Sequence, residues 1–143
     1  MPTIADELTF VDTNVLVYAF DDSDPRKRSR ASEVIESAGS GKVILSTQVL
    51  QEFFVIVTRK LARPVPVDEA EKAVRQFTHL PVVQIDPAII LSAIGATRRH
   101  KIPFWDSLIV EAALAAGCTR LLTEDLRTGA RYDDLRVENP FAI

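Results

Sequence analysis

The chain has 143 residues, 47% of them hydrophobic and 26% charged, and its formal net charge is −3. This length allows one compact hydrophobic core and excludes a second domain of ordinary size. The negative net charge excludes a general attraction to nucleic acid, so any such contact would need positive charge concentrated at one place.

The first elements alternate between strand and helix. A buried strand is expected at 8–11, followed by a buried helix or a second extended piece at 15–20. Proline favours the first position of a helix, so a helix is expected over 25–37, ended by Gly39-Ser40-Gly41. The apolar residues 43–45 predict the second strand.

The same alternation continues to the end of the chain. Ser46 is expected to cap a helix that reaches residue 61. Asp68 and Glu71 have the spacing of a capping box and predict the start of the next helix. The elements after it are a strand at 80–85, helices at 86–99 and 106–117, a strand at 120–122 and an edge strand at 136–137.

Short strands that alternate with helices of this length are typical of βαβ units, which build a parallel sheet with helices on both faces. We therefore predict an α/β fold with a short central parallel sheet of four to five strands. One domain is expected to cover residues 1–143. The pattern does not determine the order of the strands.

Four carboxylates are predicted to meet at one edge of this sheet. Asp12 directly follows the first strand, and Asp125 follows the fourth after two intervening residues. Ligands bind outside the carboxyl ends of parallel strands. The crossover helices begin at that edge as well, which places Asp106 there. Glu52 lies less than two turns into its helix, at the margin of the apolar stripe.

Each acid has a simpler explanation when it is taken alone. Asp12 and Asp106 could each be only a helix N-cap. Glu52 could be a solvated side chain, and Asp125 could be a turn residue. Glu124 is an alternative to Asp125 as the fourth acid. Caps have no reason to share one edge, so the four acids together favour a common site.

Acids that share a site repel one another, and burial raises their pKa values, unless a cation compensates. Carboxylate oxygens without a nearby histidine or cysteine favour Mg²⁺ or Mn²⁺ over zinc. We therefore expect one or two divalent cations, held by Asp12, Glu52, Asp106 and Asp125.

Four segments carry a resemblance to a known family. They are FVDTNVLVYAF at 10–20, STQVLQEF at 46–53, FWDSLIVEAA at 104–113 and LLTEDLRTG at 121–129. Their order and separations are similar to those of PIN domains, and in particular of VapC-type toxins from bacterial and archaeal toxin–antitoxin pairs. DTN alone is a weak signal, but the ordered set is specific. The ending ENPFAI also resembles chains of this family.

The resemblance implies a metal-dependent endoribonuclease that hydrolyses RNA phosphodiester bonds and acts as the toxin of such a pair. It implies that the catalytic and metal-binding acids are Asp12, Glu52, Asp106 and Asp125. It also implies supporting roles, toward the acids or the nucleic-acid backbone, for Thr13, Asn14 and Thr123. Metals at Asp12 and Asp106 would lower the pKa of a bound water for in-line attack.

Other residues have two explanations each. Basic residues cluster at 26–30, 59–63 and 98–101, as solvated helix faces or as contacts to RNA. The first cluster follows the Asp12 segment and is the best candidate to flank the site. Trp105 could stack a base or pack against its neighbour.

The family resemblance implies three partners: RNA, a cognate antitoxin whose short segment covers the acidic edge, and a second copy of the chain. The first helices are apolar enough for a homodimer. Cys118 cannot form an internal disulfide, and no apolar run approaches the roughly 18 residues of a membrane span. The first residues, MPTIADEL, lack the basic region and the long apolar region of a signal peptide. We therefore expect a cytoplasmic protein without membrane association.

Two other functions compete with the nuclease. A haloacid-dehalogenase-like phosphatase also places an aspartate after its first strand, but it needs a second one where Asn14 stands. A PIN-like module that binds RNA or protein without cutting would usually have lost one of the acids, and all four remain.

Overall fold

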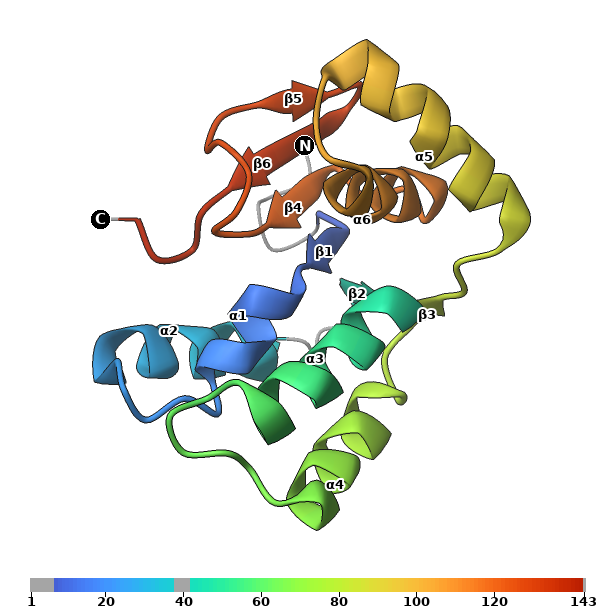
Figure 1. The fold of residues 1–143 in the computed structure, drawn as a ribbon. Helices are drawn as coiled ribbons and strands as arrows, with labels where there is room; N and C mark the ends of the chain where they lie inside the picture. The colour runs from blue at the N-terminus through green and yellow to red at the C-terminus, as the bar shows by residue number, and fades with distance from the viewer. Residues whose placement is uncertain (1–6, 38–41, 143) are drawn as a thin grey trace.

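The computed structural model describes residues 7–37 and 42–142. In this part of the chain six strands form one sheet in the order β3-β2-β1-β4-β6-β5 (Figure 1). Neighbouring strands are parallel except for the β5–β6 pair. The strands are β1 (Thr9–Val11), β2 (Val43–Ser46), β3 (Val82–Val83), β4 (Arg120–Leu122), β5 (Arg131–Tyr132) and β6 (Leu135–Glu138).

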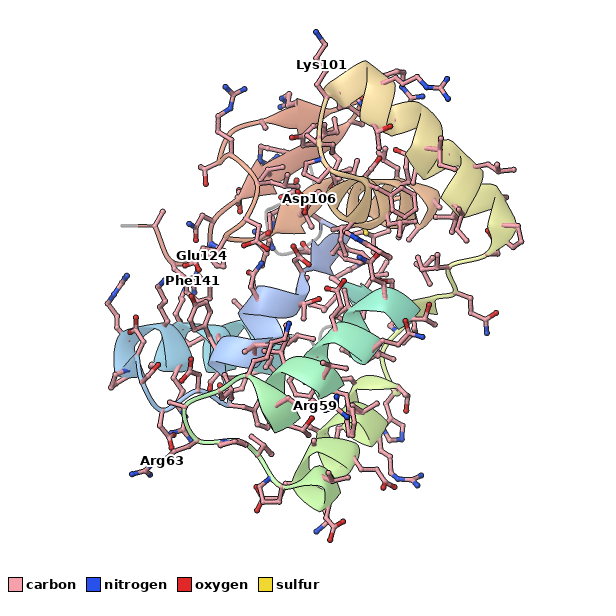
Figure 2. The ribbon with its side chains drawn as sticks, in the orientation of Figure 1. Arg59, Arg63, Lys101, Asp106, Glu124 and Phe141 are labelled. Atoms are coloured by element: carbon pink, nitrogen blue, oxygen red, sulfur yellow. The ribbon has the colours of Figure 1, made fainter. Side chains whose placement is uncertain are left out.

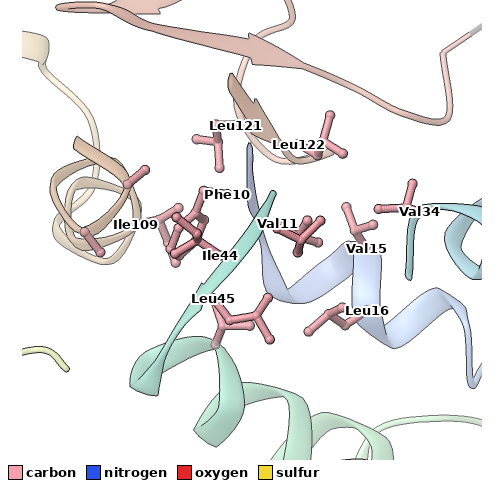
Figure 3. Packing of buried hydrophobic residues seen from close by; sticks show 14 of the residues in the cluster. Phe10, Val11, Val15, Leu16, Val34, Ile44, Leu45, Ile109, Leu121 and Leu122 are labelled. Carbon is pink, nitrogen blue, oxygen red and sulfur yellow. The ribbon is translucent and has the colours of Figure 1, made fainter. Parts of the chain in front are cut away.

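Helices cover both faces of the sheet, as predicted for this α/β fold. They are α1 (Thr13–Tyr18), α2 (Pro25–Glu36), α3 (Thr47–Arg59), α4 (Val67–Phe77), α5 (Pro87–His100) and α6 (Phe104–Ala115). Figure 3 shows Ile109 of α6 beside Phe10 on one side of β1, and Val15 of α1 beside Val11 on the other. Successive strand side chains point to opposite faces, so β1 contributes to both halves of the core.

The sheet has one strand more than the four to five expected. A two-residue loop at Asp133 and Asp134 joins β5 to β6, and Asp133 adopts the left-handed conformation that aspartate tolerates in turns. The strand expected at the edge, 136–137, therefore lies between β4 and β5. The strand expected at 80–85 is shorter, Val82–Val83. Strands of two residues are too short to show a hydrophobic period, which is why the sequence did not reveal β5.

The predicted helix starts were correct where a side chain caps the helix. Ser46 Oγ accepts a hydrogen bond from the Val49 amide at the start of α3, and Asp86 caps α5 in the same way. The segment after Asp12 is helical rather than extended. The glycines at 39–41, expected to end α2, lie outside the described residues.

Two predicted helix starts were wrong. The helix α4 begins at Val67 after Pro66, so Asp68 lies inside its first turn instead of capping it. The helix α6 begins at Phe104 after Pro103, and Asp106 likewise lies in the first turn. In both cases proline fixes the backbone just before the helix and no side chain caps it. No described helix is long and apolar enough to cross a membrane.

Candidate active site

The candidate site lies where the sheet order reverses. From β1 the chain continues to β2 and β3 on one side, whereas β4 pairs with the other side of β1. Val11 is opposite Leu122 in this pair, and the Asp12 amide donates to the Leu122 carbonyl at 3.0 Å. The residues that follow β1 and β4 are therefore neighbours, at the position where α/β sheets bind ligands.

Asp12 is both a helix cap and a buried acid. Its Oδ1 accepts a hydrogen bond from the Thr13 amide at 2.7 Å, and its Oδ2 accepts one from Thr123 Oγ1 at 2.8 Å. Only 6% of the residue is exposed. Burial raises the pKa of Asp12 to about 6, and the charges of Asp125 and Glu52 act in the same direction. Capping and a role in a shared acidic site are thus compatible.

Asn14 connects the start of α1 to the loop after β4. Its Nδ2 donates to Asp125 Oδ2 at 3.1 Å and to Thr123 Oγ1 at 3.2 Å, while its Oδ1 accepts from the Glu124 amide at 3.1 Å. The Asp125 amide also donates to Thr123 Oγ1. Asn14 and Thr123 therefore fix Asp125 relative to Asp12.

Glu52 is oriented by two polar side chains. Its Oε2 accepts from Thr13 Oγ1 at 3.0 Å, and its Oε1 accepts from Gln48 Nε2 at 3.0 Å. Gln48 also donates to the Trp105 carbonyl, which links α3 to the start of α6. Sequence reasoning missed Gln48, although its position four residues before Glu52 places both on one helix face.

Asp106 completes the acidic set from the first turn of α6. Burial raises its pKa, and the charges of Asp125 and Glu52 add to the effect. No hydrogen bond to the Asp106 carboxylate is found within the described residues, so this carboxylate is open to a ligand.

All four acids line one cavity of about 270 Å³. Figure 2 shows Asp106 near the middle of the molecule, whereas Glu124 lies beside Phe141. Asn14, Gln48 and Trp105 also border the cavity, together with apolar side chains from α1, α3 and α6. The sequence therefore located the residues that come together here, while their roles in metal binding and catalysis stay predictions.

Glu124 has other partners. Its carboxylate forms an ion pair with Lys27 and accepts a hydrogen bond from the Tyr18 hydroxyl at 2.6 Å. Burial alone would raise the pKa of Glu124, but the hydrogen bonds from Lys27 and Tyr18 and the charge of Lys27 lower it overall. Glu124 does not line the cavity. These contacts favour Asp125 over Glu124 as the fourth acid.

The basic cluster at 26–30 was expected to flank the site, but none of its residues lines the cavity. Arg26 donates to the Phe141 carbonyl at 3.2 Å, and Arg30 donates to the Pro140 carbonyl at 2.9 Å. The Phe141 ring in turn packs edge-on against Tyr18. Guanidinium groups of α2 therefore hold residues 140–141, which gives the ENPFAI segment a structural role.

Trp105 does not pack into the core. The residue is 64% exposed and borders the cavity beside Asp106. Its ring meets the Phe104 ring edge-on at a centroid distance of 5.2 Å. Cys118, by contrast, is a buried filler whose pKa burial raises to about 12.

The donors fit a hydrated magnesium or manganese ion better than a fully protein-bound metal. Within the described residues, no group of three or more His, Cys, Asp or Glu side chains could hold a metal ion by itself. Mg²⁺ commonly takes one or two carboxylates and keeps several waters. Gln48, which lines the same cavity, has a buried Oε1 without a hydrogen-bond partner among the described atoms. Neither histidine lines the cavity, which disfavours zinc.

A model of the PIN domain family matches residues 9–134 of the chain. This chain belongs to the PIN domain family. The match covers β1 to β5 and includes all four acids. A search of the curated proteins found no match.

Solved structures share the fold at low sequence identity. The Mycobacterium tuberculosis toxin VapC20, a Sarcin-Ricin loop cleaving toxin, is 22% identical over 79% of this PIN domain chain and 86% of its own, with a TM-score of 0.64. A toxin–antitoxin complex from Klebsiella pneumoniae is 18% identical over 94% and 99% of the two chains, with a TM-score of 0.70. VapBC2 from Rickettsia felis, bound to a DNA fragment from its promoter, is 18% identical over 92% and 97%, with a TM-score of 0.62.

Proposed function

We propose that this PIN domain is an endoribonuclease that hydrolyses RNA phosphodiester bonds with Mg²⁺ or Mn²⁺. The observation that carries the proposal is the convergence of four acids from separate parts of the chain on one cavity. The raised pKa values of Asp12 and Asp106 show that this arrangement disfavours their charge, which a bound cation would offset.

In this proposal Asp12 and Asp106 would hold the metal, and Glu52 and Asp125 would complete its shell or orient its waters. When bound, the metal supplies a water of lowered pKa and neutralises phosphodiester charge. The chain's own polar residues fix the acids beforehand. The side chains that donate hydrogen bonds to the acids are Thr13, Asn14, Gln48 and Thr123.

The two rival functions fit the site less well. The phosphatase needs an aspartate at position 14, but Asn14 uses both ends of its amide to hold the loop after β4. A binding module without activity has no need for four acids that face one cavity.

We further propose that the protein is a toxin paired with an antitoxin, in the cytoplasm. Its fold is shared by VapC20 and by chains solved as toxin–antitoxin complexes, which supports this role. An antitoxin segment that covers the cavity would block the four acids.

We also propose a homodimer, but not through the first helices. In the described residues, no large apolar side chain of α1 or α2 is exposed. The helix α5 exposes Ile90, Leu91 and Ile94, which form an apolar stripe that a second copy would cover. Sedimentation velocity tests this proposal, because wild type should be a dimer and Leu91→Lys a monomer. If both proteins sediment as monomers, a dimer through α5 is contradicted.

The function is tested by cleavage of an end-labelled RNA and by growth of bacteria that express the chain alone. We expect metal-dependent cleavage and growth arrest for wild type, and neither for Asp106→Asn. Glu33→Gln removes an exposed acid of α2 outside the cavity and should behave as wild type. Cleavage that persists in Asp106→Asn, or equal toxicity of both chains, would contradict the proposal.

A further inference from the structure

We propose that Trp105 is a platform on which an unpaired base of the substrate stacks, beside the four acids. The inference rests on the proposed nuclease function and adds a substrate-binding residue to it. Trp105 is the chain's single tryptophan. It is largely exposed and borders the acidic cavity together with Asp106.

The position of the indole is fixed on two sides. The Phe104 ring meets it edge-on, with an interplanar angle of 68°, which is a favourable aromatic geometry. The backbone of Trp105 is tied to α3 because its carbonyl accepts from Gln48 Nε2 at 3.3 Å. The same Gln48 orients Glu52. The ring is therefore presented to solvent from a backbone that is held in register with the acids.

The chemistry of the surroundings favours a base as the occupant. Asp106 follows Trp105 directly in the first turn of α6, so a nucleotide with its phosphate at the acids has its base within reach of the indole. Every base has a π-face and can stack on an aromatic ring without a charge or a specific hydrogen bond. Bases in a duplex already stack on one another and do not offer that face.

A second hollow gives the strand a path away from the acids. It has a volume of about 320 Å³, shares Glu52 and Ile56 with the acidic cavity, and has Lys60 at its border. A lysine amine there suits the phosphate of a neighbouring nucleotide. Trp105, the acids and Lys60 would then contact successive parts of one strand.

Because Trp105 is the only tryptophan, its fluorescence reports on this position alone. The probes are an unstructured RNA of about eight nucleotides, the same RNA annealed to its complement, and the same RNA with abasic nucleotides. Emission is recorded by stopped flow in Mg²⁺ at times before cleavage, and the RNA is then analysed for products. We expect saturable quenching by the single strand and none by the other two.

Affinity is measured in parallel from the anisotropy of labelled RNA. Trp105→Phe keeps an aromatic face and should bind as wild type. Trp105→Leu keeps the apolar bulk but loses the face, and should bind about tenfold more weakly or worse. Val67→Ala, at an exposed apolar position at the start of α4 and outside both hollows, is the matched control and should change nothing. Melting curves confirm that each variant is folded.

Several results would overturn the inference and leave the nuclease function in place. They are RNA cleavage without any change of emission, equal quenching by duplex and single strand, and wild-type affinity of Trp105→Leu. Normal RNA binding by Trp105→Leu with lost neutralisation by an antitoxin would assign Trp105 to a protein contact instead. Intact RNA after quenching would contradict the nuclease function while base stacking stands.

Discussion

Lys27 Nζ lies 2.5 Å from Glu124 Oε2, and this ion pair holds Glu124 away from the cavity that its neighbour Asp125 lines. Tyr18 reinforces the arrangement by donating to the other carboxylate oxygen. Two adjacent acids in one loop thus have different partners. One is neutralised within the protein, and the other is held by Asn14 at the site.

This difference predicts which of the two acids matters for activity. Asp125→Asn should lower kcat/KM for RNA by about tenfold or more, because in the proposed site it removes a group that would orient the metal shell. Glu124→Gln should leave the rate nearly unchanged and lower the free energy of unfolding by about 1 kcal/mol, because it weakens the pair with Lys27. Steady-state cleavage and urea unfolding measure both effects. The opposite ranking of rates would make Glu124 the fourth acid.

The buried Asp12 predicts a pH-dependent gain in stability when its charge is removed. Its pKa is raised from 3.8 to about 6 in the folded state, so its stabilising contribution is full below pH 3.8 and is lost as the pH rises through 6. Without metal, Asp12→Asn should therefore be more stable than wild type at pH 8, by up to roughly 3 kcal/mol. The difference should shrink as the pH falls from 6 toward 3.8.

Urea unfolding in EDTA across this pH range checks the prediction for Asp12. The substituted amide still accepts from the Thr13 amide but meets the donors of Thr123 and Asn14 less well, so the full gain is an upper limit. A variant that is less stable than wild type at pH 8 would show that the cap outweighs the buried charge.

Metal binding should stabilise the folded chain. A ligand that binds only the folded state stabilises it, and at a hundredfold excess over Kd the melting temperature should rise by about 5 °C or more. EDTA should reverse the shift, and Asp12→Asn should lose it. Asp68→Asn, in the first turn of α4, is the control that should keep it. Unchanged melting curves over millimolar Mg²⁺ and Mn²⁺ would count against a shared metal site.

The products of cleavage should identify the nucleophile. Neither histidine lines the cavity, so attack by a metal-activated water is expected rather than histidine-assisted attack by the 2′-hydroxyl. Water attack leaves a 5′-phosphate and a free 3′-hydroxyl. An RNA with one deoxynucleotide at the cut position should still be cleaved, and mass spectrometry of the fragments decides. Cyclic phosphate ends would exclude this mechanism.

The sequence predicted the parts of the site that depend on strand ends. Asp12 and Asp125 come shortly after buried strands, and parallel pairing brings such positions together whatever the order of the strands. It also placed Glu52 at the inner margin of α3. The start of α6 was predicted two residues too late, because Pro103 precedes the helix and no side chain caps it. Asp106 nevertheless lines the cavity, because it still lies at the start of the helix.

What the sequence could not predict are contacts between residues far apart in the chain. The basic cluster of α2 was expected to flank the site, but Arg26 and Arg30 bind carbonyls more than a hundred residues away. The pair of Lys27 and Glu124 is of the same kind. These partners become visible only when the fold brings the residues after β4 and those after β6 next to α2.

The order of the strands has a consequence for synthesis of the protein. The strand β4, whose loop carries Asp125, lies between β1 and β6, and among the six described strands β6 is synthesised last. Until residues 135–141 have left the ribosome, β4 has an unpaired edge, and the carbonyls that Arg26 and Arg30 bind are missing. We therefore expect the proposed nuclease activity to begin only after these residues have been released.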